Sequence, residues 1–422
     1  MKALVFHYSL PRFAFATVIG KLDARAYLRR PGPLFLEDVP DPPLPGPDWA
    51  LVRTALCGIC GSDTKQAFLD GAFDNPLRTL ISFPHVLGHE AVGTIERVGP
   101  SVTRRQVGER VVLNPWLSCA PRGIAEPCSS CRHGDYSLCQ NFAEGGLPPA
   151  LHIGNCRGVS GGYAPFFAAH QSQLLPIPDG VSFEQAVLCD PFAVSLHAIL
   201  KSPPPDGGLA LVYGCGTLGL LSVAILHDLF PGARVAIVAR YAYQADLGRA
   251  LGAHEAILTR DPAEVVERVG ALTGSKVHRG PKGEPWLLGG ADVVYDTIGS
   301  AECVAVDLRV ARPRANVVIT GVNKPARFEW TPLYFKEIGI LGANAFGLET
   351  WDGKRKHGME HYLDMVNERG LDLSRLVTHR FRLEQYQEAL LLAHRKGRHA
   401  AVKAVFDFTH EGASLARAWP QP

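Results

Sequence analysis

The chain has 422 residues, of which 46% are hydrophobic and 20% are charged, so wholesale disorder is excluded and two or three domains are expected. Lys and Arg number 43 against 41 Asp and Glu, and a net charge of +2 argues against a nucleic-acid-binding protein. Ten cysteines are too few for a disulfide scaffold, and several of them are clustered. Such clustering indicates metal binding in a reducing compartment.

One apolar stretch, residues 207–226, is long enough to cross a bilayer. Its glycines and the patterned turn in its middle instead favour a buried strand at 209–213, a glycine turn and a buried helix. The first twenty residues do not read as a signal peptide. We therefore expect a cytoplasmic protein without a membrane partner.

The chain up to about residue 190 is predicted to consist of short strands and irregular loops. Five prolines between residues 34 and 52 predict an extended or turning segment there. Short β-branched runs separated by glycine predict strands at 91–98 and 109–112.

From residue 192 to about 341, apolar strands alternate with helical stretches. The predicted elements are strands at 210–213, 234–239, 291–296 and 316–320, and helices at 218–229, 244–251 and 303–309. Near-continuous apolar strands in such an alternation predict a parallel sheet covered on both faces. Residues 274–289 are polar and rich in Gly and Pro, which predicts an inserted loop. The tail is predicted to form helices at 357–368 and 383–395 and a strand at 401–408.

A glycine turn follows the strand at 210–213. Gly214, Gly216 and Gly219 fit the pattern G-x-G-x-x-G, and Thr217 and Leu218 open the helix after it. In this setting the glycines permit a tight turn, close approach of a pyrophosphate and close packing of helix on strand. An ordinary tight turn is the alternative, but the position between strand and helix favours a dinucleotide site.

About 20 residues further on, a carboxylate normally binds the ribose of NAD. Here the strand at 234–239 runs into Arg240, with no acidic residue. An arginine supplies a bidentate partner for a 2′-phosphate, so the sequence predicts a preference for NADP over NAD. The alternative is a solvated Arg240 and use of both cofactors.

Four cysteines lie within 21 residues: Cys119, Cys128, Cys131 and Cys139. Four soft ligands suit a closed, structural zinc site. A nucleic-acid-binding zinc module is the other interpretation, but the neighbourhood has few basic residues.

A second set of candidate ligands is dispersed along the chain: Cys60, His89 and Asp190. Each alone is unremarkable, since buried cysteines, core histidines and N-terminal helix aspartates are common. Together, one thiolate, one imidazole and one carboxylate make a three-ligand zinc site with an open fourth position, which is the catalytic arrangement.

These motifs occur in the order of a known family. They are CGICGSD at 57–63, GHE at 88–90, VGTIERVG at 92–99, the four cysteines, GGYA at 161–164, Asp-Pro at 190–191 and GCGTLG at 214–219. The chain resembles the zinc-dependent medium-chain alcohol dehydrogenases, and is most similar to their polyol- and threonine-type branch.

The resemblance implies a doubly wound Rossmann domain at 192–341, inserted into a β-rich GroES-like catalytic domain formed by 1–191 and 342–422. A structural-zinc lobe would occupy about 114–140. The implied activity is hydride transfer between an alcohol and a nicotinamide cofactor, with two zinc ions per chain. Secondary alcohols, polyols and sugars are the expected substrates, and relatives are dimers or tetramers.

Carried over by position, the resemblance assigns roles to individual residues. Cys60 and His89 would bind the catalytic zinc, and Asp190 stands where polyol-type members carry Glu. Glu90 would be the acid beside the zinc, and Asp63 would orient His89. Two further roles concern the reactants: Ser62 would accept the alcohol proton, and Lys403 would contact the cofactor phosphates.

The sequence departs from the family pattern at several points. The N-terminus carries extra residues from Tyr8 to about Arg30, and Cys119 precedes Cys128 by nine residues instead of three. Lys65 replaces a His that often ends the proton relay. Because Asp190 is shorter than Glu, Cys189 and Glu90 remain alternative third ligands.

Two other functions are alternatives to hydride transfer to or from an alcohol. One is a zinc-independent quinone or enone reductase of the same superfamily, and the other is a catalytically inactive cofactor-binding module. Zinc-independent reductases lack the dispersed ligands and the four-cysteine lobe. The presence of Cys60, His89 and Ser62 argues against an inactive module, so the sequence favours the zinc-dependent dehydrogenase.

Overall fold

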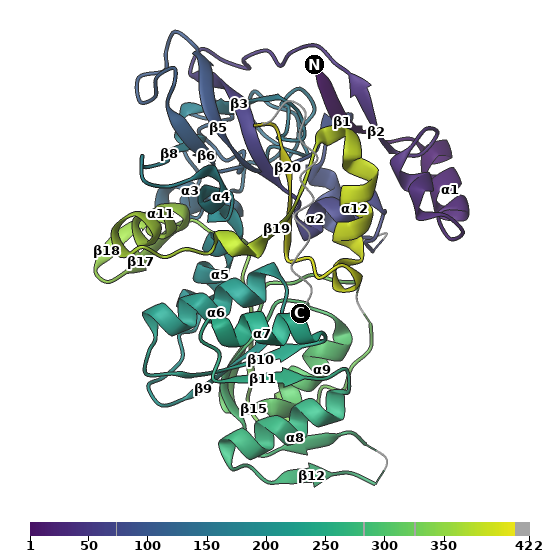
Figure 1. The fold of residues 1–422 in the computed structure, drawn as a ribbon, viewed down its shortest axis with the longest axis vertical. Coiled ribbons are helices and arrows are strands. Elements are labelled where there is room, and N and C mark those ends of the chain that lie inside the picture. The colour runs from purple at the N-terminus through teal and green to yellow at the C-terminus, as the bar shows by residue number, and fades with distance from the viewer. Residues whose placement is uncertain (73, 282, 325, 410–422) are drawn as a thin grey trace. The chain divides into compact units, whose positions relative to one another are not determined.

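The computed structural model describes residues 1–72, 74–281, 283–324 and 326–409. The chain forms two compact units (Figure 1): the first contains Met1–Asp190 and the chain from Met359 onward, and the second is Pro191–Gly358. The first boundary lies within a residue of the expected one. The second lies at 358 instead of about 341, because the hairpin of β17 (Leu348–Trp351) and β18 (Lys354–His357) belongs to the second unit.

The first unit is built on a seven-stranded sheet. Its strands, in spatial order, are β19 (Val377–Phe381), β20 (Lys403–Asp407), β3 (Trp49–Gly58), β5 (Glu90–Val98), β6 (Arg110–Leu113) and β8 (Leu174–Pro176), with β7 (Phe166–His170) also paired to β3. Strands β5, β6 and β20 confirm the predicted strands at 91–98, 109–112 and 401–408. Because β3 is covered by three partners, it is buried along nearly its whole length.

The register of this sheet brings distant motifs together. Gly58, at the end of β3, lies opposite both Glu90 at the start of β5 and Val405 in β20. The CGICGSD segment, the GHE segment and Lys403 therefore meet where the ends of three neighbouring strands, β20, β3 and β5, lie together.

Smaller elements complete the first unit. A three-stranded sheet is formed by β2 (Leu34–Asp38), β1 (Lys2–Phe6) and β4 (His85–Val86). The extra N-terminal residues form α1 (Leu10–Ile19) and a 3-10 turn at Ala24–Leu28. The predicted tail helices are α11 (Gly358–Arg369) and a 3-10 turn continuing into α12 (Tyr386–His394).

The second unit is built on a six-stranded parallel sheet. The spatial order is β11 (Glu255–Leu258), β10 (Arg234–Ala239), β9 (Leu209–Tyr213), β14 (Ala291–Asp296), β15 (Ala311–Ile319) and β16 (Gly339–Gly342). Numbered along the chain this order is 3-2-1-4-5-6, the doubly wound arrangement of dinucleotide-binding domains. The predicted parallel sheet is confirmed.

Helices pack against this sheet as two pairs (Figure 1). One pair is α6 (Thr217–Leu229) with α7 (Ala242–Ala250), and the other is α8 (Pro262–Thr273) with α9 (Ala301–Val310). The apolar stretch 207–226 divides into β9, the glycine turn and α6, all largely buried. Among the described residues, no helix is long and apolar enough to span a membrane.

The segment 274–289, predicted to be an inserted loop, contains regular structure. The segment contains a hairpin of β12 (Val277–Arg279) and β13 (Pro285–Leu287), with Val277 opposite Leu287. Leu287 is fully buried in the core of the second unit. The hairpin went unpredicted because its strands are three residues long, too short to show a period of two among the polar residues.

A pair of buried carboxyl groups lies in the second unit. Asp296 ends β14, and its Oδ1 accepts hydrogen bonds from the N–H groups of Ile298 (2.8 Å) and Gly299 (2.9 Å). Asp307 lies on α9, and both aspartates are fully buried. Burial and then the charge of Asp296 raise the pKa of Asp307 well above its ordinary value, so the folded unit holds a proton there.

We expect Asp307→Asn to gain stability over the parent chain as the pH rises. A raised pKa in the folded state gives stability that is present below the unfolded pKa of about 4 and is lost at higher pH. Asparagine removes this loss, by on the order of 1.4 kcal/mol per pH unit. Urea unfolding at pH 5 and pH 8 measures the effect, with Asp246→Asn, at an exposed position of α7, as the control. An equal difference between variant and parent at both pH values would contradict a proton held at Asp307.

Candidate active site

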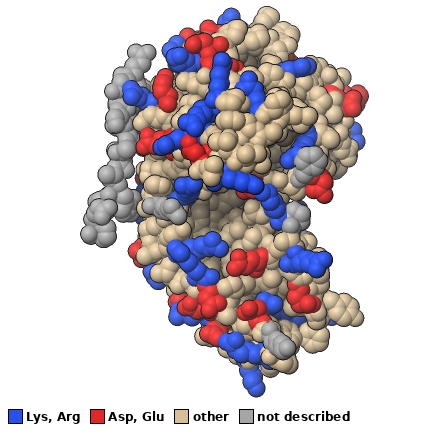
Figure 2. All heavy atoms as spheres, turned by 90° about the vertical axis from the view of Figure 1, so that its right-hand side faces the viewer, with Lys and Arg blue, Asp and Glu red and all other residues tan. Residues whose placement is uncertain are grey.

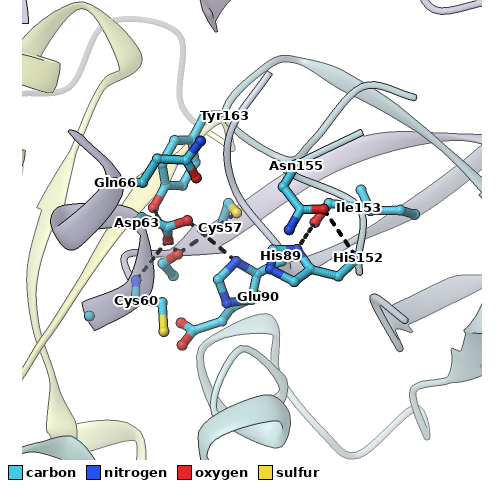
Figure 3. Close-up of polar contacts among 12 residues, drawn as sticks. Cys57, Cys60, Asp63, Gln66, His89, Glu90, His152, Ile153, Asn155 and Tyr163 are labelled. Carbon is cyan, nitrogen blue, oxygen red and sulfur yellow. Dashed lines mark hydrogen bonds and ion pairs between the residues drawn. The ribbon is translucent and has the colours of Figure 1, made fainter. Parts of the chain in front are cut away.

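The dispersed motifs converge in the first unit (Figure 3). Cys60 caps the N-terminus of α2 (Gly61–Ala67), directly after β3, while His89 and Glu90 stand at the start of β5. One ligand atom from each of these three residues lies within 4.8 Å of the other two. His89 and Glu90 are buried and Cys60 is partly exposed, so the cluster is accessible from one side.

Asp63 holds the histidine of this cluster. Its Oδ1 lies 3.3 Å from His89 Nδ1, and its Oδ2 accepts hydrogen bonds from the Cys60 N–H (3.0 Å) and the Tyr163 hydroxyl (2.7 Å). Burial alone would raise the pKa of Asp63, but His89 and these donors outweigh burial and lower it. Asp63 is therefore a buried carboxylate that fixes the orientation of the His89 ring.

The donor set fits a zinc ion. Because Asp63 occupies Nδ1 of His89, the other ring nitrogen faces Cys60 and Glu90, as Figure 3 shows. One sulfur, one imidazole nitrogen and one carboxylate oxygen are the ligand types of catalytic zinc sites with an open position.

The other predicted residues lie around this cluster. Asp190 is buried in the first turn of α5 (Cys189–Lys201), outside the set of atoms within 4.8 Å, and the third member of that set is Glu90. Burial and then the charge of Glu90 raise the pKa of Asp190 to about 7. Cys189 is fully buried and also lies outside the set.

Lys403 and Ser62 occupy opposite environments. Lys403, the first residue of β20, is buried, and its Nζ forms an ion pair with Glu90. Its side chain therefore reaches the metal-ligand cluster. Ser62 is exposed in the first turn of α2, two residues after Cys60.

The four clustered cysteines form a second donor set. Cys119, Cys128, Cys131 and Cys139 all place Sγ within 4.8 Å of one another, and none is in a disulfide. Cys119 Sγ and Cys139 Sγ are 3.6 Å apart, and Cys128 Sγ and Cys139 Sγ are 4.0 Å apart. A tetrahedron with zinc–sulfur bonds of about 2.3 Å has edges of about 3.8 Å, so these distances fit zinc.

Local N–H groups support negative charge on two of these sulfurs, those of Cys119 and Cys128, whereas burial raises the pKa of Cys131 and Cys139. The Cys119 sulfur accepts from the Cys128 N–H at 3.4 Å and from Asn141 Nδ2 at 3.3 Å. Burial opposes ionisation of Cys128, but N–H groups of Gln140 and Cys131 outweigh burial and lower its pKa to about 6. Thiolates are the form of cysteine that binds metal.

The glycine turn in the second unit fits a dinucleotide. Gly214 has a left-handed φ of 103°, and a side chain at Gly219 would collide with the Gly214 carbonyl oxygen. A Cβ built on Gly216 meets nothing within 4 Å, so the open side of the turn is there. Gly216 caps the 13-residue helix α6, and the N-terminus of a helix at such a glycine turn attracts an anion such as a pyrophosphate.

Arg240 directly follows β10 and is exposed. Its N–H donates to Gln244 Oε1 at 3.3 Å, which orients the turn into α7. A second guanidinium, that of Arg260, lies over the neighbouring Tyr241 ring at 5.2 Å from its centroid. Two arginines therefore lie near the end of β10, of which the sequence analysis identified only Arg240.

Two further residues beside the metal cluster were missed. Tyr163 belongs to the GGYA motif, and its hydroxyl bond to Asp63 has no signal in a single sequence. His152 lies in an irregular loop, with its ring centroid 4.6 Å from that of His89. Its neighbours in sequence show no spacing that indicates a ligand or a catalytic group.

Comparison with known proteins identifies the same two parts. The model described as Alcohol dehydrogenase GroES-like domain matches residues 46–179, and the model described as Zinc-binding dehydrogenase matches residues 217–370. One solved structure is that of a zinc-binding dehydrogenase from Sinorhizobium meliloti bound to NADP, and its sequence is 26% identical to that of this chain. It has a TM-score of 0.67, and the match covers 89% of this chain and 96% of that one.

Curated relatives match over most of their length. Probable D-xylulose reductase A of Neosartorya fischeri is 30% identical over 314 residues, which are 74% of this chain and 79% of that protein. Sorbitol dehydrogenase of Bacillus subtilis is 26% identical over 355 residues, 84% of this chain and 89% of that protein. The predicted family, fold class and enzyme class are thereby confirmed: the chain belongs to the zinc-dependent medium-chain alcohol dehydrogenases, oxidoreductases that use a nicotinamide cofactor.

Proposed function

We propose that this enzyme interconverts a secondary alcohol, polyol or sugar and the corresponding carbonyl compound, with NADP as the preferred cofactor. The observation that carries the proposal is the cluster of Cys60, His89 and Glu90, with Asp63 behind it. Relatives named for sorbitol and xylulose support a polyhydroxylated substrate.

Each part of the chain would have a distinct task. When bound, zinc polarises an alcohol oxygen, and the oxidised nicotinamide accepts hydride from the adjacent carbon. Cys60, His89 and a carboxylate would hold the zinc: Glu90 stands in the cluster, with Asp190 nearby. Asp63 fixes the His89 ring, and the exposed Ser62 hydroxyl would take the alcohol proton. The turn at Gly214–Gly219 would hold the pyrophosphate, and Lys403 would balance negative charge beside the cluster.

Arginine side chains support the cofactor preference. Arg240 stands where NAD-specific domains carry a carboxylate, and Arg260 lies close by. Two guanidinium groups suit a 2′-phosphate. The S. meliloti relative that binds NADP supports the same preference.

The remaining proposals concern the assembly of the enzyme. Cys119, Cys128, Cys131 and Cys139 would bind a second, structural zinc, because their sulfurs match a tetrahedral site. All ten cysteines are free, which supports a reducing compartment such as the cytoplasm. The homodimer or homotetramer expected from the family resemblance stays a prediction.

Initial rates with NADP and NAD, against a panel of alcohols, polyols and sugars, test the function. We expect a lower KM for NADP, and we expect Arg240→Asp to raise that KM by about ten- to a hundredfold, since a charge-assisted bond is lost. The KM for NAD should change by no more than about twofold. Arg234→Ala, at the exposed start of the same strand, is the control. Equal KM values for the two cofactors, unaffected by Arg240→Asp, would contradict the NADP preference.

A further inference from the structure

His152 lies beside the metal-ligand cluster but is not part of it. Its ring is tilted by 44° against that of His89, with centroids 4.6 Å apart, and Figure 3 shows the two imidazoles side by side. His152 contributes no atom to the set within 4.8 Å formed by Cys60, His89 and Glu90. As a residue it is partly exposed.

The loop holds the His152 ring in one orientation. The backbone N–H of His152 donates to Asn155 Oδ1 at 3.1 Å, and the backbone of His152 pairs with that of Trp116 in an isolated β-bridge. The Trp116 and His152 rings also pack perpendicular to each other, with centroids 5.8 Å apart. A loop side chain fixed by this many contacts is pre-organised to bind a ligand.

One hydrogen bond determines which ring nitrogen is available. His152 Nδ1 lies 2.6 Å from the carbonyl oxygen of Ile153, and because a carbonyl only accepts, Nδ1 must carry the hydrogen. In the neutral ring Nε2 is then an acceptor. Among the described residues, no hydrogen bond to Nε2 is found.

We propose that His152 Nε2 is a hydroxyl-binding subsite that selects substrates with a second hydroxyl next to the reacting one. This inference rests on the proposed function, in which the first hydroxyl lies at Cys60, His89 and Glu90. In a vicinal diol or polyol the second oxygen is one carbon–carbon bond from the reacting carbon, and His152 is the imidazole that packs against the ligand His89. Its O–H then donates to Nε2. A monohydric alcohol leaves Nε2 without that partner, and sites built to bind a hydroxyl discriminate against ligands that lack one.

The alternative of a metal ligand at His152 does not match the geometry. Its Nδ1 is bonded to Ile153, and neither nitrogen belongs to the cluster of ligand atoms. A purely structural role would be served by the Nδ1 bond and the Trp116 contact, and would leave no reason for binding to depend on a second hydroxyl.

Equilibrium binding provides a test that does not depend on turnover. The probes are 2,3-butanediol and 2-butanol, titrated into the zinc-loaded enzyme with NADPH bound and followed by calorimetry. The parent enzyme should bind the diol more tightly. We expect His152→Phe to raise the Kd for the diol about tenfold, as for loss of one hydrogen bond, and the Kd for 2-butanol by no more than about twofold. His152→Gln, which keeps an acceptor, should retain most of the discrimination.

His7→Phe is the control, since His7 is a partly exposed histidine of the same unit that also stacks on a ring, that of Phe35. It should leave both Kd values unchanged. Equal weakening of diol and 2-butanol by His152→Phe, or no preference for the diol in the parent enzyme, overturns the subsite. If alcohols are still oxidised in that case, the proposed function stands. If no alcohol is oxidised, the proposed function fails, while the binding ratio still decides the subsite.

Discussion

Cys60→Ser is expected to lower kcat by at least about a thousandfold. Cys60 supplies the thiolate of the three-ligand cluster, and loss of a Lewis acid worth several kcal/mol in the transition state corresponds to that factor. Zinc content should fall by one ion per chain. The affinity for NADPH should stay within about twofold, because the glycine turn that fits the pyrophosphate belongs to the second unit.

Fluorescence titration with NADPH and metal analysis check these results together. Cys156→Ser is the matched control: Cys156 is a buried thiol of the same unit outside both clusters, and its carbonyl contacts can be kept by a hydroxyl. That variant should keep its zinc and its activity. Complete loss of NADPH binding in Cys60→Ser would show that metal binding and cofactor binding are not divided between the two units. Full turnover would show that Cys60 is not a ligand of the catalytic metal.

Cys139→Ser is expected to destabilise the chain by about 3–5 kcal/mol. A structural zinc contributes its binding energy to folding, and the rest of the domain retains part of the lobe's structure. Cys139 Sγ faces both Cys119 and Cys128, so its removal breaks the tetrahedron at a buried corner. One zinc per chain should be lost, and proteolysis should cut first near residues 119–141.

Urea unfolding and limited proteolysis measure this effect. Cys303→Ser, a buried cysteine of the second unit that lies outside the four-cysteine set, is the control and should keep both zinc ions. A Cys139→Ser variant with unchanged zinc content and unchanged unfolding midpoint would contradict a structural metal.

Motifs with local spacing were predictable from the sequence. The four cysteines, the glycine turn and the buried strands of the second unit each lie in a short window, where spacing or apolar content carries the signal. The balance of charges is also seen on the surface. Figure 2 shows Lys and Arg interspersed with Asp and Glu over the face it draws, as expected for a net charge of +2.

Features that depend on tertiary contacts could not be predicted in the same way. The choice between Glu90 and Asp190 as the third member of the cluster depends on the register of β3 with β5, which places Glu90 opposite Gly58. The contact of His152 with His89 joins two loops 63 positions apart. Single positions of this kind show no periodicity, so only the fold reveals them.

One chain would thus hold two zinc sites of different kind, one for catalysis and one for structure. Anomalous diffraction at the zinc absorption edge, on crystals of the purified enzyme, tests it most directly. We expect two peaks per chain, one among the sulfurs of the four-cysteine lobe and one bonded to Cys60 Sγ and His89 Nε2. A single peak in the lobe, with none at Cys60 and His89, would contradict it.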